Sequence, residues 1–312
     1  MWVIRSVKHM IVAENLTKRY GARAAVTDVS FQVRPGAVTG FLGPNGAGKS
    51  TTMRMIVGLD DPTSGTVTVG GHSYARSGSP LTEVGVLLDA KAVHSGRTAR
   101  NHLRAMAASH GIPARRVDEV LEITGLTAVA RKRAGGFSLG MGQRLGIAAA
   151  LLGDPQTLIL DEPVNGLDPE GVRWVREFVR SYAASGRTVL LSSHLMSEMA
   201  QTADHLIVLG KGRVLADAPL PQLVSQWTRE DVLVRSPRAA ELASALRSDT
   251  VTVATTAPDE LIVSGAPAAH VGDIAAASGI TVHQLTTRTG SLEEAYMALT
   301  GDAVEYKTKD MK

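Results

Sequence analysis

The sequence predicts an α/β fold with a mainly parallel central sheet. Short apolar runs, which are typical of buried strands, occupy residues 37–42, 157–160, 188–192 and 206–209. Segments with helical spacing of apolar residues separate these runs, and this alternation favours a parallel sheet covered by helices. A second set of strands and helices begins beyond Pro219 and Pro221. The fold is therefore expected to include a small C-terminal α+β module.

The first elements are strands followed by a helix. Val29, Phe31 and Val33 alternate with polar neighbours, as in a strand with one buried face. A helical pattern covers residues 51–57 and ends at Gly58. It is followed by a turn at 61–65 and a strand at 66–69. A buried strand and a helix thus flank the glycine-rich segment at 43–48.

Residues 90–152 differ in character from what precedes them. They are rich in Ala, Arg and Leu, and their apolar residues recur at helical spacing, as at Leu103, Met106 and Ala107. We interpret them as a helical insertion, with a helix at 145–152. Strands and helices alternate again from residue 157 onwards.

The C-terminal module, residues 221–300, shows the order β-α-β-β-α-β. Its predicted elements lie at residues 231–235, 239–246, 251–255, 261–263, 268–277 and 280–285. This order is that of the split, ferredoxin-like arrangement. Ser291 with Glu294 has the pattern of a capping box that opens a last helix. Residues 301–312 are a charged tail.

The composition of the chain argues against several kinds of site and partner. The 312 residues contain no cysteine, which rules out disulfides and cysteine metal sites. Lys and Arg total 33 against 30 for Asp and Glu, so the charge does not indicate a nucleic-acid partner. No run reaches the ~18 apolar residues that a membrane-spanning helix needs. Residues 1–9 are too short and too interrupted for a signal peptide, and we interpret them as an N-terminal arm.

The segment between the first apolar run and its helix matches the phosphate-loop pattern G-x-x-x-x-G-K-[ST] in full. Its glycines let backbone N–H groups turn toward phosphate oxygens, and the helix that follows adds its positive end. Lys49 would contact the terminal phosphates of ATP, and the Ser50 hydroxyl would bind Mg²⁺. The predicted nucleotide-binding residues are Gly43, Pro44, Asn45, Gly46, Ala47, Gly48, Lys49, Ser50 and Thr51. This motif predicts a P-loop NTPase core.

Two acids, Asp161 and Glu162, follow the apolar run at 157–160. An Asp at the end of a buried strand is the usual second Mg²⁺ ligand of a phosphate-loop enzyme. Glu162 comes next and would polarise the attacking water as general base. Without a phosphate loop in the same chain, an acidic turn after a core strand would be an equally good interpretation.

The segment Phe137-Ser138-Leu139-Gly140-Met141-Gly142-Gln143-Arg144 resembles the L-S-G-G-Q signature of ATP-binding cassette (ABC) proteins in a variant form. Ser138 and Gly140 stand at a helix start, which suits anion binding. In this family the anion is the γ-phosphate bound by the other subunit. An ordinary Ser N-cap is the simpler alternative. A dinucleotide fingerprint does not fit, because Gly146 falls one place too late.

The resemblance covers residues 10–220 and implies further parts. Tyr20 matches the aromatic residue that stacks on adenine. Asp168 matches the loop that communicates across the dimer, and His194 matches the switch histidine. The family fold also implies an antiparallel β subdomain. The resemblance points most closely to bacterial drug and antibiotic exporters of the daunorubicin and bacitracin resistance type.

One position departs from the family pattern. Asp89 stands where the family usually has the Gln that touches Mg²⁺ and the membrane partner. We interpret Asp89 as a substitute that binds Mg²⁺ or orients water. It would add a third carboxylate near Asp161 and Glu162. Repulsion among the three negative charges would raise the pKa of one of these carboxyl groups.

These patterns predict an ATPase that energises a separate membrane permease, an exporter component at the cytoplasmic face of the membrane. They also predict a homodimer that encloses ATP between its subunits, because one chain contains both halves of a composite site. Two alternatives remain: a soluble ABC ATPase acting on ribosomes or DNA, and a nucleotide-binding regulator without turnover. The chain has a single cassette and no sustained heptads, which argues against a role on ribosomes or DNA. The presence of Glu162 and His194 argues against a regulator without turnover.

Overall fold

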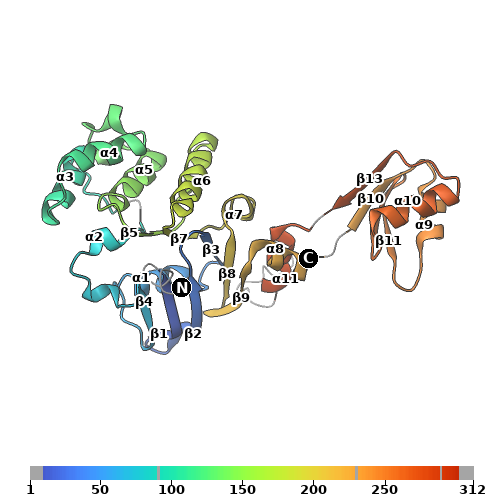
Figure 1. Ribbon diagram of the computed structural model, residues 1–312, viewed down its shortest axis with the longest axis horizontal. Helices are drawn as coiled ribbons and strands as arrows, with labels where there is room; N and C mark the ends of the chain where they lie inside the picture. The colour runs from blue at the N-terminus through green and yellow to red at the C-terminus, as the bar shows by residue number, and fades with distance from the viewer. Residues whose placement is uncertain (1–9, 90–91, 229–230, 289, 302–312) are drawn as a thin grey trace, which may run out of the picture. The chain divides into compact units, whose positions relative to one another are not determined.

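The computed structural model describes residues 10–89, 92–228, 231–288 and 290–301 (Figure 1). Along the chain these residues divide into two units, the first ending at Pro219 and the second running from Leu220 to Gly301. The arm at 1–9 and the tail beyond Gly301 lie outside the described residues. No helix among the described residues is long and apolar enough to cross a membrane.

A six-stranded sheet forms the centre of the first unit. Its strands are in the order β5-β6-β7-β3-β8-β9, parallel from β5 to β8 and antiparallel at β9. Their bounds are β3 Val38–Leu42, β5 Val84–Leu87, β6 Thr157–Leu160, β7 Thr188–Ser192, β8 His205–Gly210 and β9 Arg213–Pro219. Every residue of β3, β6 and β7 is buried, as expected for strands covered on both faces. The predicted mainly parallel sheet is confirmed.

A separate three-stranded antiparallel sheet has the order β2-β1-β4. Its strands are β1 Ile11–Tyr20, β2 Arg23–Val33 and β4 Ser64–Val69. The alternating apolar residues of β2, Val29, Phe31 and Val33, are all buried. The rings of Phe31 and Phe41 lie 5.5 Å apart, so β2 and β3 share one core.

Helices complete the first unit. They are α1 Lys49–Ile56, α2 Pro80–Glu83, α3 Ala99–Ser109, α4 Arg115–Ile123, α5 Leu139–Ala150, α6 Pro169–Ala184 and α7 Met196–Thr202. Short 3₁₀ turns lie at Tyr74–Arg76, Thr127–Val129 and Ala134–Gly136. Helices α3, α4 and α5 gather beside β5 (Figure 1) and bury Leu103, Leu121 and Leu145 between them.

The predicted helix at 145–152 was wrong at both ends. Helix α5 begins at Leu139, because the Ser138 side chain accepts a hydrogen bond from the Met141 N–H over 3.2 Å and caps the helix. The helix start expected at Ser138 and Gly140 is therefore confirmed, and the apolar residues at 145–152 mark only the later part of the helix.

The second unit contains a four-stranded antiparallel sheet in the order β11-β12-β10-β13. Its elements are β10 Asp231–Arg235, α9 Ala239–Leu246, β11 Thr252–Ala257, β12 Glu260–Ser264, α10 Ala268–Ala277 and β13 Gln284–Arg288. The order and pairing are those of the split β-α-β-β-α-β arrangement. Leu242, Val234 and Val263 are buried in its core.

Two further helices, α8 Leu220–Trp227 and α11 Leu292–Thr300, pack against each other in the second unit. The capping box of Ser291 and Glu294 at α11 is confirmed. Helix α8 was not expected from a segment with two prolines, yet Pro221 lies in its first turn, where no helical hydrogen bond is lost. The last strand was predicted four residues too early, because the Ile280 N–H bonds to the Ala275 carbonyl and closes α10 instead.

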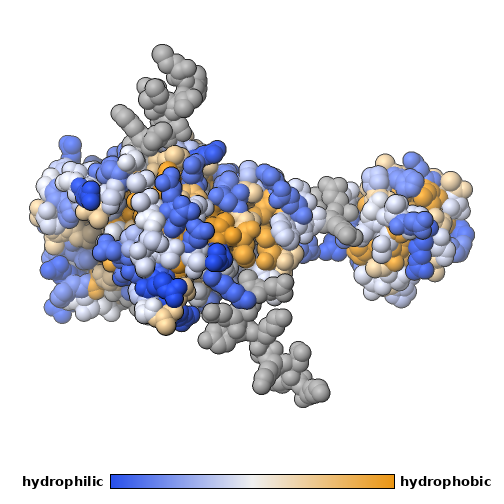
Figure 2. Space-filling view, turned by 90° about the horizontal axis from the view of Figure 1, so that it is seen from below, coloured by the Kyte–Doolittle hydropathy of each residue, from blue (hydrophilic) through white to orange (hydrophobic). Residues whose placement is uncertain are grey.

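The surface is largely hydrophilic, with hydrophobic residues gathered in a few patches (Figure 2). Large apolar side chains that are exposed include Leu139, Leu195, Leu215, Trp227 and Met297. Scattered apolar residues are normal on a protein surface.

Candidate active site

The phosphate loop joins the end of β3 to the start of α1. Gly46 and Gly48 have φ values of +84° and +100°, which glycine adopts without strain. A Cβ on Gly48 would also lie 2.7 Å from the Ala25 carbonyl oxygen. Both conformation and space therefore require glycine in this loop.

Lys49 is buried beneath the loop that it terminates. Its Nζ donates to the Gly43 and Pro44 carbonyls over 2.6 and 3.3 Å. Burial lowers the pKa of Lys49, while the nearby carboxylates of Glu162 and Asp161 act in the opposite direction. The ammonium group thus lies where the loop would receive phosphate oxygens.

A cavity of about 430 Å³ opens over the loop. Residues 45–51 line it together with Tyr20, Arg23 and Ala25. Tyr20 ends β1 and is 49% exposed, and its hydroxyl donates to Asp60 over 2.9 Å. That hydrogen bond raises the pKa of Tyr20. The structure brings Tyr20 and the phosphate loop to one cavity, and Lys18 Nζ lies 5.1 Å from the centroid of the Tyr20 ring.

Asp161 links the phosphate loop to the sheet. The Ser50 hydroxyl donates to its Oδ2 over 2.7 Å, and the Ser192 hydroxyl donates to its Oδ1 over 2.5 Å. These contacts arise because β6 and β7 are neighbours and end at the same edge as β3. A hydroxyl and a carboxylate oxygen at this spacing are the hard ligands that Mg²⁺ prefers, so Ser50 and Asp161 fit the metal.

Glu162 has an unusual backbone, with φ at +51° in the left-handed region. Its N–H donates to Ser192 Oγ over 3.0 Å, and its carbonyl accepts from Gln143 Nε2 over 3.1 Å. Its carboxylate Oε2 lies 2.6 Å from His194 Nδ1 and accepts from the His194 N–H over 3.4 Å. Glu162 is thus held at its backbone and at its side chain.

The signature residues lie at the start of α5, next to the loop that follows Glu162. A Cβ on Gly140 would lie 3.1 Å from the Gly166 carbonyl oxygen, so this helix start packs closely on that loop. Asp168 ends the loop and caps α6, accepting from the Gly171 N–H over 2.9 Å. Ser138 lines a cavity of about 320 Å³ that contains no phosphate-loop residue.

Asp89 is exposed two residues beyond β5. The pairing of Leu87 with Leu160 places it level with Glu162 at the same edge of the sheet. Among the described residues, however, no three acidic or histidine side chains converge to hold a metal ion. The expected grouping of Asp89 with Asp161 and Glu162 as a three-acid metal site is therefore not found among the described residues.

Two residues of the site were missed in the sequence, Ser192 and Gln143. Ser192 contacts both acid-bearing residues and Gln143 the second of them. Ser192 could have been found, because it ends the apolar run that leads to His194. Nothing in the sequence around Gln143 pointed to Glu162.

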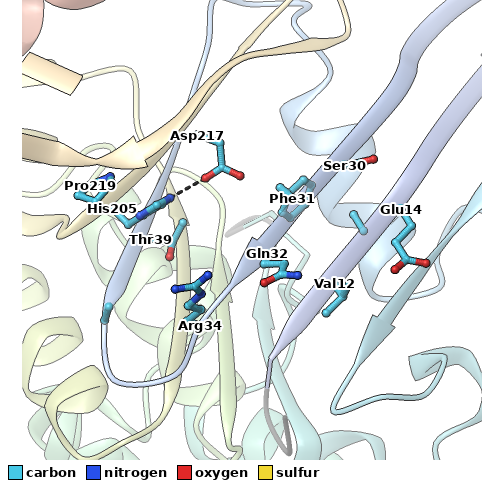
Figure 3. A pocket seen from close by; sticks show the side chains of 12 residues that line it. Val12, Glu14, Ser30, Phe31, Gln32, Arg34, Thr39, His205, Asp217 and Pro219 are labelled. Carbon is cyan, nitrogen blue, oxygen red and sulfur yellow. Dashed lines mark hydrogen bonds and ion pairs between the residues drawn. The ribbon is translucent and has the colours of Figure 1, made fainter. Parts of the chain in front are cut away.

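A larger cavity, of about 640 Å³, lies elsewhere in the first unit (Figure 3). It opens at the N-terminal ends of β3 and β8, whereas the phosphate loop follows the C-terminal end of β3. His205 Nε2 and Asp217 Oδ1 form a hydrogen bond of 2.6 Å on one wall, opposite Phe31 and Gln32 of β2. Glu14 and Arg34 add one charge of each sign. This cavity shares no residue with the phosphate-loop cavity.

Comparison with known proteins gives two family matches. Residues 26–165 match the family described as ABC transporter, and residues 230–293 match a domain family of unknown function. The chain is 42% identical over 217 residues to the bacitracin transport ATP-binding protein BcrA of Bacillus licheniformis, covering 69% of this chain and 71% of that protein. It is 33% identical over 305 residues to the daunorubicin resistance ATP-binding protein DrrA3 of Streptomyces coeruleorubidus, covering 94% and 96%.

Solved structures agree with these matches. An ATP-binding subunit of an ABC transporter superposes with a TM-score of 0.61 at 30% identity, covering 70% of this chain and 92% of that one. CbiO1 of Clostridium perfringens, part of an ABC transporter complex, superposes with a TM-score of 0.60 at 26% identity, covering 69% and 90%.

Proposed function

This chain belongs to the ATP-binding proteins of ABC transporters, and we propose that it binds MgATP at the phosphate-loop cavity and hydrolyses it with Glu162 as general base. The hydrogen-bonded series Ser50–Asp161–Ser192–Glu162–His194 carries this proposal. It connects the loop that would hold the phosphates to the carboxylate that would accept a proton. A general base typically contributes 10²–10⁴-fold in rate.

Each residue has a chemical task in this proposal. Lys49 and the loop N–H groups bind phosphate oxygens, and the half-exposed Tyr20 ring stacks on adenine. Ser50 and Asp161 would hold Mg²⁺, which when bound neutralises phosphate charge. Glu162 takes the proton of the attacking water, and His194, 2.6 Å away, keeps its carboxylate oriented. Asp89, exposed at the same edge, serves as a substitute for the usual Gln.

We propose that two chains close on ATP as a homodimer. The signature residue Ser138 lines a different cavity from the phosphate loop, so one chain does not enclose a nucleotide by itself. A second copy would present its signature to the open phosphate-loop cavity, with Asp168 near the junction. Light scattering on Glu162→Gln with MgATP should show a dimer. A monomer under these conditions would count against closure.

We further propose a separate membrane permease as partner, at the cytoplasmic face of the membrane, with antibiotics or other lipophilic compounds exported. The names of the bacitracin and daunorubicin relatives support this assignment. In this view residues 10–220 are the nucleotide-binding domain, with the helical part at 90–152 beside the permease. Residues 221–300 are an accessory domain that supports the dimer or regulates it. No nucleic acid takes part.

Two experiments test the proposal. The purified chain should release phosphate from MgATP, and a nucleotide-binding regulator would not. An affinity pull-down from solubilised membranes of its own host should recover a polytopic membrane protein in near-equal amount. Recovery of ribosomal or DNA-associated proteins instead would overturn the transport role while leaving the ATPase mechanism in place.

The role of Asp89 needs its own test. If Asp89 serves Mg²⁺ or water, Asp89→Gln will change the ATPase rate or the Mg²⁺ concentration that supports half the maximal rate. No change in either quantity would contradict the role proposed for Asp89.

A further inference from the structure

Gln143 is a buried residue of α5 that lies outside the five-residue signature. It is 5% exposed, five residues beyond the cap residue Ser138. Its Nε2 donates to the Glu162 carbonyl over 3.1 Å. The orientation of the amide is fixed chemically, because a carbonyl oxygen only accepts hydrogen bonds and must face the NH₂ group.

The backbone that Gln143 contacts is strained. Glu162 is one of the few non-glycine residues of the described chain in the left-handed region, and such a conformation persists only where its surroundings hold it. The structure holds it from two sides, with Ser192 at the N–H and Gln143 at the carbonyl. Loss of either contact would let the residue relax and move its carboxylate.

The other polar atom of the Gln143 amide is its oxygen, Oε1. Its Oε1 is buried and has no hydrogen-bond partner among the residues that the structure describes. A buried acceptor without a partner costs stability, so Gln143 is a poor choice for folding alone. An apolar residue of similar length would fill the space without that cost.

We propose that Gln143 is a positioning residue that fixes the catalytic geometry of Glu162 from the signature helix. The inference rests on the proposed role of Glu162 as general base. Because Ser138 and Gly140 open the same helix, any displacement of α5 by a bound anion would act on the Glu162 carbonyl through Gln143. The signature and the general base would thus be coupled by one hydrogen bond within the chain.

The direct test is Gln143→Met, which keeps the length of the side chain and removes both polar atoms. The ATPase kcat of the full chain should fall 10- to 100-fold, as expected when a general base loses alignment. The KM for ATP should stay within about threefold, since Gln143 does not line the nucleotide cavity. The unfolding temperature should stay level or rise. A lowered unfolding temperature with an unchanged kcat would show a structural role only and overturn the proposal.

Thr124→Val provides the matched control. Thr124 is also buried, but its hydroxyl bonds only to the Val120 carbonyl of its own helix. Its removal should leave kcat at the parent value. A fall equal to that of Gln143→Met would mean that any buried polar deletion in this region slows turnover, which overturns the proposal.

Gln143→Glu adds a pH readout that a structural role would not produce. An ionised carboxylate has no donor for the Glu162 carbonyl, whereas a protonated one does. Its kcat relative to that of the parent should therefore recover as pH falls. A ratio that does not change with pH would contradict the proposed hydrogen bond.

A double-mutant cycle separates this inference from the proposed function. In a Glu162→Gln background, Gln143→Met should cause no further loss of kcat, because both changes act on one residue. A multiplied loss would show that Gln143 acts elsewhere and overturn the inference. If Glu162→Gln hydrolyses ATP at the parent rate, the role of Glu162 itself is overturned. If Glu162→Gln is slow but Gln143→Met has the parent kcat, only the inference about Gln143 is overturned.

Discussion

Ser192 joins the two acids of the site, donating its hydroxyl to Asp161 over 2.5 Å while accepting the Glu162 N–H over 3.0 Å. Ser192 is buried at the end of β7, next to the strand that delivers both acids. One hydroxyl therefore sets the relative position of the proposed metal ligand and the proposed base.

Ser192→Ala should slow ATP turnover and should also lower the free energy of unfolding. It leaves a carboxylate oxygen and a backbone N–H without their partner, at a cost of about 1–3 kcal/mol in the free energy of unfolding. We expect kcat to fall at least about tenfold, because Glu162 loses a backbone constraint. The neighbouring variant Ser193→Ala removes a hydroxyl that caps Leu195 instead. If both variants turn over at the same rate, Ser192 does not position the acids.

Gly48→Ala should abolish nucleotide binding. The added Cβ would meet the Ala25 carbonyl at 2.7 Å, and a non-glycine residue at φ +100° is strained by about 1–2 kcal/mol. Gly186→Ala is the matched control, because its φ is +88° and its Cβ would meet nothing within 4 Å. The control should lose stability but bind ATP normally, as measured by titration with a fluorescent ATP analogue. Normal binding by Gly48→Ala would contradict the assigned loop geometry.

Tyr182 should make stability fall in alkaline solution. Burial raises the pKa of Tyr182 to about 12, against 10.0 for a free tyrosine, with Arg187 opposing the shift. The folded state then binds more protons than the unfolded state between these values, so stability decreases as pH rises. The two-unit shift corresponds to at most about 3 kcal/mol. Denaturant unfolding above about pH 10 should show this slope for the parent and a flatter one for Tyr182→Phe. Equal slopes would exclude Tyr182 as their source.

Asp217→Asn should leave ATP hydrolysis unchanged. The hydrogen-bonded pair of Asp217 and His205 is partly exposed and lies in the cavity that shares no residue with the phosphate-loop cavity. Exposed pairs typically contribute about 0–1 kcal/mol, so the unfolding free energy should change by no more than that. A large fall in kcat would show that this cavity is coupled to the site.

The parts of the site that the sequence predicts are those with local causes. The phosphate loop is recognisable because its left-handed backbone at Gly46 and Gly48 restricts these positions to glycine. Asp161 is recognisable because it directly follows a continuous apolar strand. The order of strands and helices in both units is readable for the same reason, since burial of one or both faces sets the apolar pattern.

What the sequence does not predict depends on contacts between distant segments. Ser192 meets Asp161 across 31 positions of the chain, and Gln143 meets Glu162 across 19, and neither pairing has a local pattern. The start of β13 depends on its pairing with β10, not on the apolar residues Ile280 and Val282 that precede it.

The most direct test of the central claim is the rate of ATP hydrolysis by Glu162→Gln, measured beside its affinity for MgATP. The amide keeps the shape of the side chain but cannot take a proton. We predict a fall in kcat of about 10²-fold or more, with ATP affinity within a few-fold of the parent. Hydrolysis at the parent rate with normal affinity would contradict the assignment of Glu162 as general base.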